Sequence, residues 1–161
     1  MSGISVELID ALLQPNHDRS AEKTFKSISL PDRVNGLFHL ISSLSLQDVP
    51  RSMLTCVLLR RDISSLGEYS IKNADQGMDI TKMLGIFISP LLNIMYSSGV
   101  DTQVQRLLGH VIAEICSVLS LLDAQLASNS VSLVLDKIAD MVSFQNIFET
   151  FRTKEDSCND L

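Results

Sequence analysis

The chain has 161 residues, of which 45% are hydrophobic and 5% aromatic, and it carries a net charge of −6. This length fits one domain with a substantial core, and a core filled by aliphatic side chains favours packed helices over an aromatic-rich β-sandwich. An excess of 19 Asp and Glu over 13 Lys and Arg disfavours nucleic acid, whose phosphates such a surface repels, and favours basic protein partners.

The cysteines and the apolar runs indicate in which cellular compartment the protein is expected. Cys56, Cys116 and Cys158 form no CxxC pair and have no histidine at metal-ligand spacing. An odd number of cysteines without a signal peptide predicts a reducing, intracellular environment. The longest apolar run, residues 83–96, contains Pro90 and is shorter than the about 20 residues of a membrane span. We therefore expect a soluble protein that contacts no membrane.

The first part of the chain predicts four helices. Residues 4–14 form the first, which ends at Pro15, and Asp18 is a suitable N-cap for the second. Pro31 opens the third helix, where its missing N–H costs nothing, and Pro50 lies in the first turn of the fourth. The apolar residues expected on the buried sides of the first three helices are Val6, Ile9, Leu12, Leu13, Ala21, Phe25, Ile28, Val34, Leu37, Phe38, Ile41 and Leu44.

A polar connector is expected after the fourth helix. That helix should stop at Gly67, and residues 67–77, which are polar and bounded by glycines, form the longest connector. The next helix spans residues 78–98, with a kink at Pro90 and an end at Gly99.

Two further helices complete the expected set of seven. Asp101 caps the sixth, and the last starts at Asn129 or Ser130. Residues 1–151 should form one domain and residues 152–161 a frayed polar tail. In the two helices before the last, the polar positions form one narrow line, so each helix must contact neighbours on at least two sides. Antiparallel hairpins stacked in a row satisfy this requirement, and so does a compact bundle.

Residues that could carry catalysis are scattered. The chain has no phosphate-binding glycine loop and no zinc-protease or serine-hydrolase motif, and its three histidines are isolated from one another. Asp136 and Asp140 stand one turn apart beside Lys137, which fits a solvated helix face better than a metal site. We therefore expect a protein that is not an enzyme, with no catalytic residue, no cofactor and no metal.

Four motifs carry a resemblance to a known family. They are LLQP, DRSAEKTF, LPDRVNGLFHLISSL and LTCVLLRRDISSL, in this order within residues 4–66. In order and spacing they resemble the N-terminal HEAT repeats of the importin-β (karyopherin-β) family, and most of all its importin-five (karyopherin-beta-three) branch. Over residues 78–151 the likeness is architectural, with HVIAEI similar to the second helix of the third repeat.

The resemblance implies an all-α fold, an α-solenoid of about three and a half HEAT-type antiparallel helix hairpins. In the family the second helix of each hairpin lines a concave channel, where the first repeats bind Ran in its GTP form and so release cargo. The resemblance also implies a non-enzymatic nuclear transport receptor that shuttles between cytoplasm and nucleus through the nuclear envelope. Basic cargo proteins and FG-nucleoporins are partners of the full-length receptor. Because family members are far longer, we expect an N-terminal fragment or a much reduced relative.

A pair of arginines interrupts the aliphatic run of the fourth helix. On a helical wheel Arg51, Thr55 and Asp62 share one direction, Arg60 points the opposite way, and Arg61 lies between. In one interpretation the pair meets the dipole near the helix C-terminus while its stems lie along apolar neighbours. Under the resemblance, the pair faces the Ran-binding channel and Asp62 orients one of the two guanidinium groups.

Three interpretations of function stay open. The first is the Ran-binding receptor, the second is a HEAT-type scaffold or adaptor unrelated to Ran, and the third is a helical bundle that encloses a small ligand. An open array would leave Leu133, Val134, Ile138 and Phe144 partly uncovered and so promote self-association, whereas a closed bundle would not.

Overall fold

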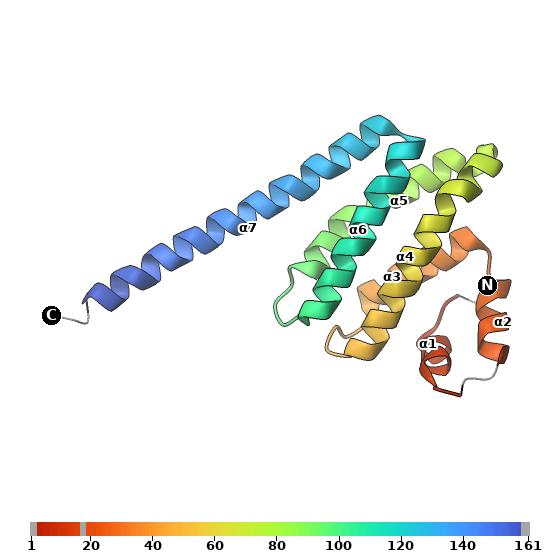
Figure 1. Cartoon of the computed structure of the whole chain (residues 1–161), viewed down its shortest axis with the longest axis horizontal. Coiled ribbons are helices and arrows are strands. Elements are labelled where there is room, and N and C mark those ends of the chain that lie inside the picture. The colour runs from red at the N-terminus through yellow and green to blue at the C-terminus, as the bar shows by residue number, and fades with distance from the viewer. Residues whose placement is uncertain (1–2, 17–18, 159–161) are drawn as a thin grey trace.

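The structure, a computed structural model, describes the backbone of residues 3–16 and 19–158 and the side chains of residues 3–16 and 19–141. Within this part of the chain there are seven helices and no strand, which confirms the all-α prediction (Figure 1). The helices are α1 (Val6–Leu13), α2 (Arg19–Ser27), α3 (Leu30–Ser43), α4 (Val49–Lys72), α5 (Ala74–Met95), α6 (Thr102–Leu122) and α7 (Ala124–Cys158).

Short polar side chains begin most of the helices by accepting a backbone N–H that has no partner inside the helix. The Asp101 carboxylate accepts the Gln103 N–H at 2.8 Å, as its position in the sequence predicts. Pro31 and Pro50 stand in the first turns of α3 and α4. The predicted cap Asp18 lies outside the described residues. The residues that cap with a side chain are Ser5, Ser29, Asp48, Asp101 and Asp123.

The polar connector predicted for residues 67–77 is wrong. Helix α4 passes through Gly67, and Asn73 alone separates it from α5, so this stretch is helical apart from Asn73. Gly67 is buried against α6, and Leu66 beside it is fully buried. Burial of a leucine side chain contributes about 1.5–3 kcal/mol, which offsets the about 1 kcal/mol that a glycine costs inside a helix.

The start predicted for the last helix is also wrong. Helix α7 begins at Ala124, ahead of the predicted Asn129 or Ser130, because the Asp123 carboxylate caps its first turn. It continues to Cys158, so residues 152–158, which were expected in a frayed tail, lie in this helix. Its described part carries the partial exposure expected of an open array: Leu133 and Ile138 are exposed and Val134 is half-buried, while the Phe144 side chain lies outside the described residues.

Helix α5 ends earlier than expected and contains a proline. Pro90 lies inside the helix, which ends at Met95 before a turn that leads to α6. Gly99 adopts a φ of 81° in this turn, a conformation that favours glycine. The predicted helix stop at Gly99 is therefore wrong, because the C-cap of α5 is Tyr96 and Gly99 lies in the turn beyond it.

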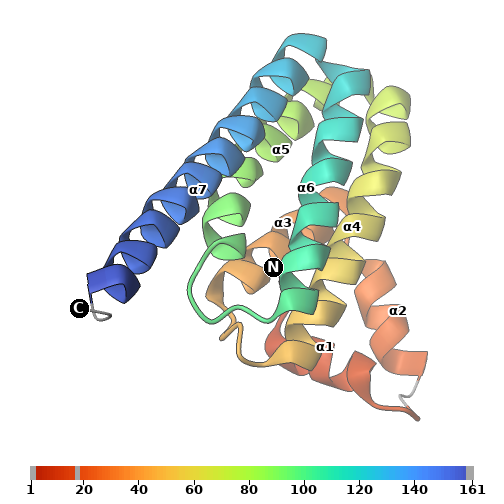
Figure 2. The ribbon, with the colours of Figure 1, turned by 60° about the vertical axis from the view of Figure 1, so that its left-hand side comes forward.

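The long helices form two layers. Helix α4 packs on α3 and α6 packs on α5, while α4 contacts α6 in one layer and α3 contacts α5 in the other (Figure 2). Helix α7 contacts α5 and α6 and then extends away from the rest, and α1 and α2 lie at the opposite end (Figure 1). Both α5 and α6 thus contact neighbours on more than one side, as their narrow polar lines predict.

A single aliphatic core runs between the layers. Phe38 of α3 stacks on Phe87 of α5 with ring centroids 3.8 Å apart. The predicted inward stripe of α3 is buried apart from the half-buried Leu44, whereas Leu13 of α1 is exposed. The largest fully buried side chains are Ile9, Leu37, Ile41, Leu59, Ile63, Leu66, Leu84, Ile88, Leu91, Leu108, Ile115 and Leu119.

Candidate functional site

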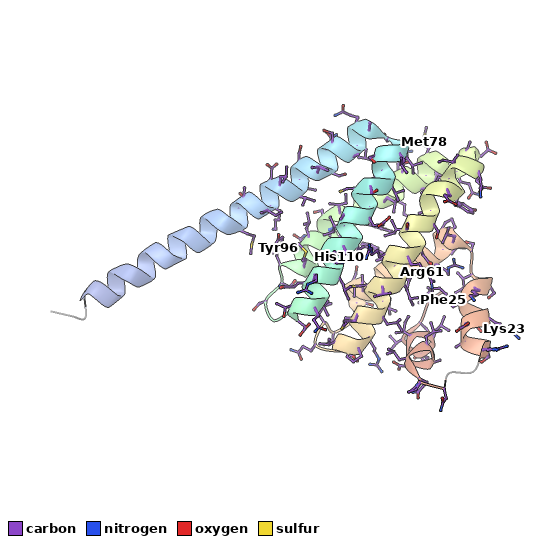
Figure 3. The ribbon with its side chains drawn as sticks, in the orientation of Figure 1. Lys23, Phe25, Arg61, Met78, Tyr96 and His110 are labelled. Carbon is purple, nitrogen blue, oxygen red and sulfur yellow. The ribbon has the colours of Figure 1, made fainter. Side chains whose placement is uncertain are left out.

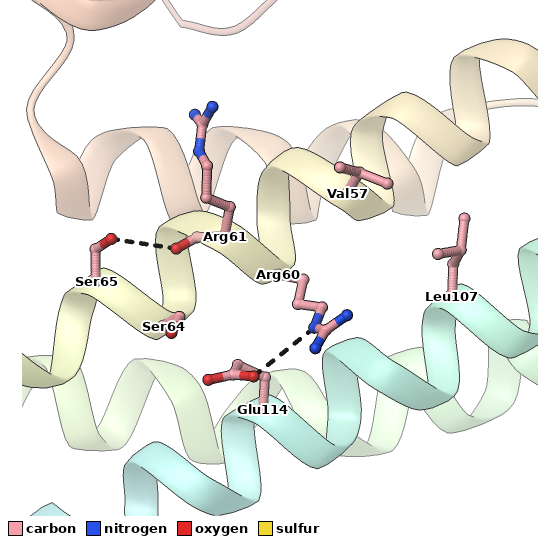
Figure 4. Close-up of a pocket in the computed structure, with 7 residues that line it drawn as sticks. All are labelled: Val57, Arg60, Arg61, Ser64, Ser65, Leu107 and Glu114. Atoms are coloured by element: carbon pink, nitrogen blue, oxygen red, sulfur yellow. Dashed lines mark hydrogen bonds and ion pairs between the residues drawn. The ribbon is translucent and has the colours of Figure 1, made fainter.

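Arg60 and Arg61 lie in the middle of α4, about three turns before its end at Lys72. The interpretation that places the pair at a helix C-terminus is therefore wrong, because the dipole acts only within about the last turn. The two side chains diverge: Arg60 points to α6, and Arg61 points to the other side of α4 (Figure 4).

Arg61 belongs to a polar cluster that joins three helices. At its centre is Asp62, whose side chain is only 3% exposed. Its carboxylate accepts Arg33 Nε–H at 2.9 Å and Arg61 Nε–H at 3.1 Å. Both guanidinium groups lie over the Phe25 ring, at 5.3 and 5.6 Å from its centroid. Figure 3 labels Arg61 on α4 and Phe25 on α2. The cluster ties α2 and α3 to α4. Of the three residues expected to contact Ran, Asp62 is buried and the two arginines are exposed.

In the polar line of α4, Thr55 and Asp62 are buried, whereas Arg51 contacts α1 with a side chain that is 36% exposed. Arg51 donates to the Asp10 carboxylate of α1 at 2.8 Å, and this hydrogen bond lowers the pKa of Asp10. Thr55 is buried and donates its hydroxyl to the Arg51 carbonyl at 2.8 Å. The helical wheel correctly placed these three residues on one side of α4. Their partners on α1 and α3, however, could be identified only from the tertiary structure.

An open groove of about 460 Å³ runs between α4 and α6 beside Arg60 (Figure 4). In it, Arg60 Nε lies 3.8 Å from Glu114 Oε2 of α6, and the two side chains are 51% and 22% exposed. At this distance the contact is a loose ion pair that water and a partner can reach. The residues that line the groove are Val57, Arg60, Arg61, Ser64, Ser65, Leu107 and Glu114.

Exposed apolar side chains continue this surface towards the C-terminal ends of both helices. Ile71 of α4 and Leu121 of α6 are 68% and 71% exposed. A Cβ added to Gly67 would lie 3.9 Å from Leu121, which shows how closely the two helices approach here. We call this surface the α4/α6 face and define it by the groove residues together with Ile71 and Leu121.

The cysteines and histidines form no reactive site within the part of the chain that the structure describes. Cys56 is buried, which raises the pKa of its thiol to about 12, and partial burial also raises the pKa of Cys116. Both thiols are therefore protonated at neutral pH and are poor nucleophiles. His39 and His110 are exposed side chains on different helices.

The paired carboxylates of α7 are exposed. Asp136 and Asp140 are solvated, as expected. Among the described side chains, no three His, Cys, Asp or Glu residues come together in a way that could hold a metal ion. His17 and the side chain of Cys158 lie outside the described residues.

Helices α5 and α6 are both long and apolar enough to cross a membrane, judged by length and composition alone. Helix α5 has 22 residues, which is longer than the apolar run recognised in the sequence. Buried core helices of soluble proteins meet the same criterion, and both helices here pack in the core and contact helices of both layers. Of the most apolar 18-residue window, 33% is buried in α5 and 39% in α6.

No protein-family model, no curated protein and no solved structure matches the chain. The resemblance to importin-β receptors therefore depends on the sequence motifs alone, and the α4/α6 face is interpreted from its own geometry.

Proposed function

We propose that this chain is an importin-β-like transport receptor segment that binds Ran in its GTP form through the α4/α6 face. The observation that carries the proposal is the position of the exposed Arg60 and Arg61. They lie on the layer formed by the second helices of two consecutive helix pairs, α3/α4 and α5/α6. The resemblance assigns this layer to the concave channel, where relatives bind Ran.

The stacking of the helix pairs supports a HEAT-type solenoid. Pairs α3/α4 and α5/α6 lie side by side with like helices in contact, and α7, which contacts α5 and α6, would be the first helix of a further pair. In this proposal the protein is not an enzyme and shuttles between cytoplasm and nucleus. Cargo proteins and FG-nucleoporins contact additional repeats of the full-length receptor.

The chemistry of the arginines suits a protein partner that presents carboxylates. A guanidinium group binds a carboxylate through two parallel hydrogen bonds, which adds geometric specificity to the charge attraction. The Arg61 side chain is already oriented by Asp62, so less side-chain entropy is lost when a partner binds it. The net charge of −6 disfavours a nucleic acid as the occupant.

The test is the affinity of the purified chain for Ran loaded with a non-hydrolysable GTP analogue or with GDP, measured by calorimetry. We expect preference for the GTP form and a loss of about tenfold or more with Arg60→Ala, because exposed arginines at interface centres carry much of the binding energy. Lys82→Ala, on α5 in the opposite layer, removes the same charge and should change nothing.

Arg60 is the better position for this test, since Arg61 also contacts Phe25 and Asp62 and its loss weakens the fold. Equal affinity for both nucleotide states, or none for either, would contradict the Ran assignment. Such a result would leave the scaffold or adaptor interpretation as the better account of the helix pairs.

A further inference from the structure

The α4/α6 face has a repeating pattern that the Ran assignment does not use. On α6, Leu107, Glu114 and Leu121 follow one another at seven-residue spacing, which puts them on one side of the helix. On α4, Val57 and Ile71 stand two such repeats apart and point within about 60° and about 20° of the direction of Arg60. The face therefore has apolar side chains at both ends, with Glu114 midway along the α6 row and Arg60 about one turn after Val57 on α4.

The ion pair in the middle is weaker in geometry than the other arginine contacts of the described chain. Arg33 Nε lies 2.9 Å from Asp62, and Arg51 Nη2 lies 2.8 Å from Asp10, whereas Arg60 Nε lies 3.8 Å from Glu114. The Glu114 carboxylate thus neutralises Arg60 without a close hydrogen bond. Since Arg60 is about half exposed, a better-placed carboxylate can reach it from solvent.

From this geometry we infer that Glu114 is an internal competitor for Arg60. The occupant of the face is a protein segment with a carboxylate between apolar side chains, and that carboxylate replaces Glu114 at Arg60 when the segment binds. The inference deepens the proposed function and rests on it for the identity of the partner, while the chemistry of the occupant comes from the face itself.

The size and charge of the face favour such a segment. Val57 and Ile71 lie about 20 Å apart along α4, a span that about four turns of a partner helix would cover. Apolar side chains at both ends bury surface, and Arg60 between them matches an acidic group in charge.

The first experiment needs no natural partner. The probe is a synthetic helical peptide with glutamates in the centre of a leucine stripe, and its control has glutamines in their place. Binding is followed by NMR through the Arg60 Nε–Hε resonance. We expect this resonance to move with the glutamate peptide only, and Glu114→Gln to tighten that peptide about two- to fivefold, the range of an exposed ion pair.

A matched variant separates competition from general charge repulsion. Asp79→Asn removes one negative charge from an exposed position of α5, in the opposite layer, and should leave the affinity nearly unchanged. The inference is overturned if Glu114→Gln fails to tighten the glutamate peptide, if Asp79→Asn tightens it equally, or if the Arg60 resonance does not move.

The same variants measured with GTP-loaded Ran distinguish the two proposals. If the peptide responds to Glu114→Gln and Ran does not bind, the Ran assignment fails and the competition stands. If Ran binds in its GTP form and Glu114→Gln changes neither affinity, the competition fails and the Ran assignment stands.

Discussion

At the scale of single residues, the arginines of α4 have three separate roles. Arg51 pairs with Asp10 and Asp48 at the start of the helix, Arg61 packs on Phe25 beside Asp62, and Arg60 faces the groove. The Arg60–Arg61 pair, which looks like one basic motif in the sequence, is thus divided between holding α2 in place and forming a surface. This division follows from the 100° turn between neighbouring residues of a helix.

Replacing Asp62 should test the buried cluster. Asp62→Asn leaves Arg33, whose side chain is 17% exposed, without its carboxylate partner, so we expect a loss of about 2–3 kcal/mol in the free energy of unfolding. Urea unfolding followed by circular dichroism measures this value. Asp79→Asn, at an exposed position of α5, should change stability by less than about 0.5 kcal/mol. A similar small effect at both positions would contradict the structural role of Asp62.

The Asp10–Arg51 pair predicts a pH-dependent contribution to stability. The hydrogen bond from Arg51 lowers the pKa of Asp10 below its usual value of 3.8. A lowered folded-state pKa means a contribution that is full above about pH 4 and is lost as the pH falls through the folded value. We therefore expect Asp10→Asn to lower the melting temperature at about pH 6, and expect this difference to shrink at about pH 3. A difference that stays constant between these pH values would contradict the ion pair.

At the scale of helices, the length of α4 depends on what lies beside it. Its last part contains Gly67 and Ser70, residues with low helix propensity, and the helix still continues to Lys72. Gly67 and Ser70 are buried in this part. Contact with α6 therefore outweighs the local preference for a turn.

Two glycine substitutions distinguish a glycine inside a helix, Gly67, from a glycine in a turn, Gly99. At Gly67 an added Cβ would meet Val118 at 3.7 Å, an ordinary contact, so Gly67→Ala should raise the free energy of unfolding by about 0.5–1 kcal/mol. At Gly99, with a φ of 81°, Gly99→Ala should lower it by about 1–2 kcal/mol. Thermal or urea unfolding of both variants tests the assignment. Destabilisation by Gly67→Ala would support a turn at this position.

At the scale of the whole molecule, α7 is the long helix whose apolar side chains are least covered by neighbouring helices. Helices α3 and α5 are each covered by the second helix of their pair, whereas α7 extends past α5 and α6 (Figure 1). The exposed apolar residues in its described part are Val131, Leu133, Leu135 and Ile138. In an array of stacked pairs, this is the surface that a following helix would cover.

We expect this surface to promote self-association at high protein concentration. Sedimentation velocity should show a concentration-dependent increase in mass for the unchanged chain. The combined change Leu135→Lys and Ile138→Lys should abolish that increase by placing charges in the contact. Met78→Lys, at an exposed apolar position of α5, should not abolish the increase. A chain that stays monomeric at all concentrations would contradict the open array and favour a closed bundle.

The sequence by itself determined the number and type of the helices, their proline-led and aspartate-capped starts, and the buried stripe of α3. These features depend on contacts within a few residues, which periodicity and capping chemistry report directly. Only the tertiary structure decided that α4 continues through Gly67, because burial against α6 is a long-range effect. It also decided that Asp62 is buried between two arginines and that Arg60 meets Glu114, since these partners lie on helices far apart in the sequence. Nothing local in a sequence encodes which helix packs beside which.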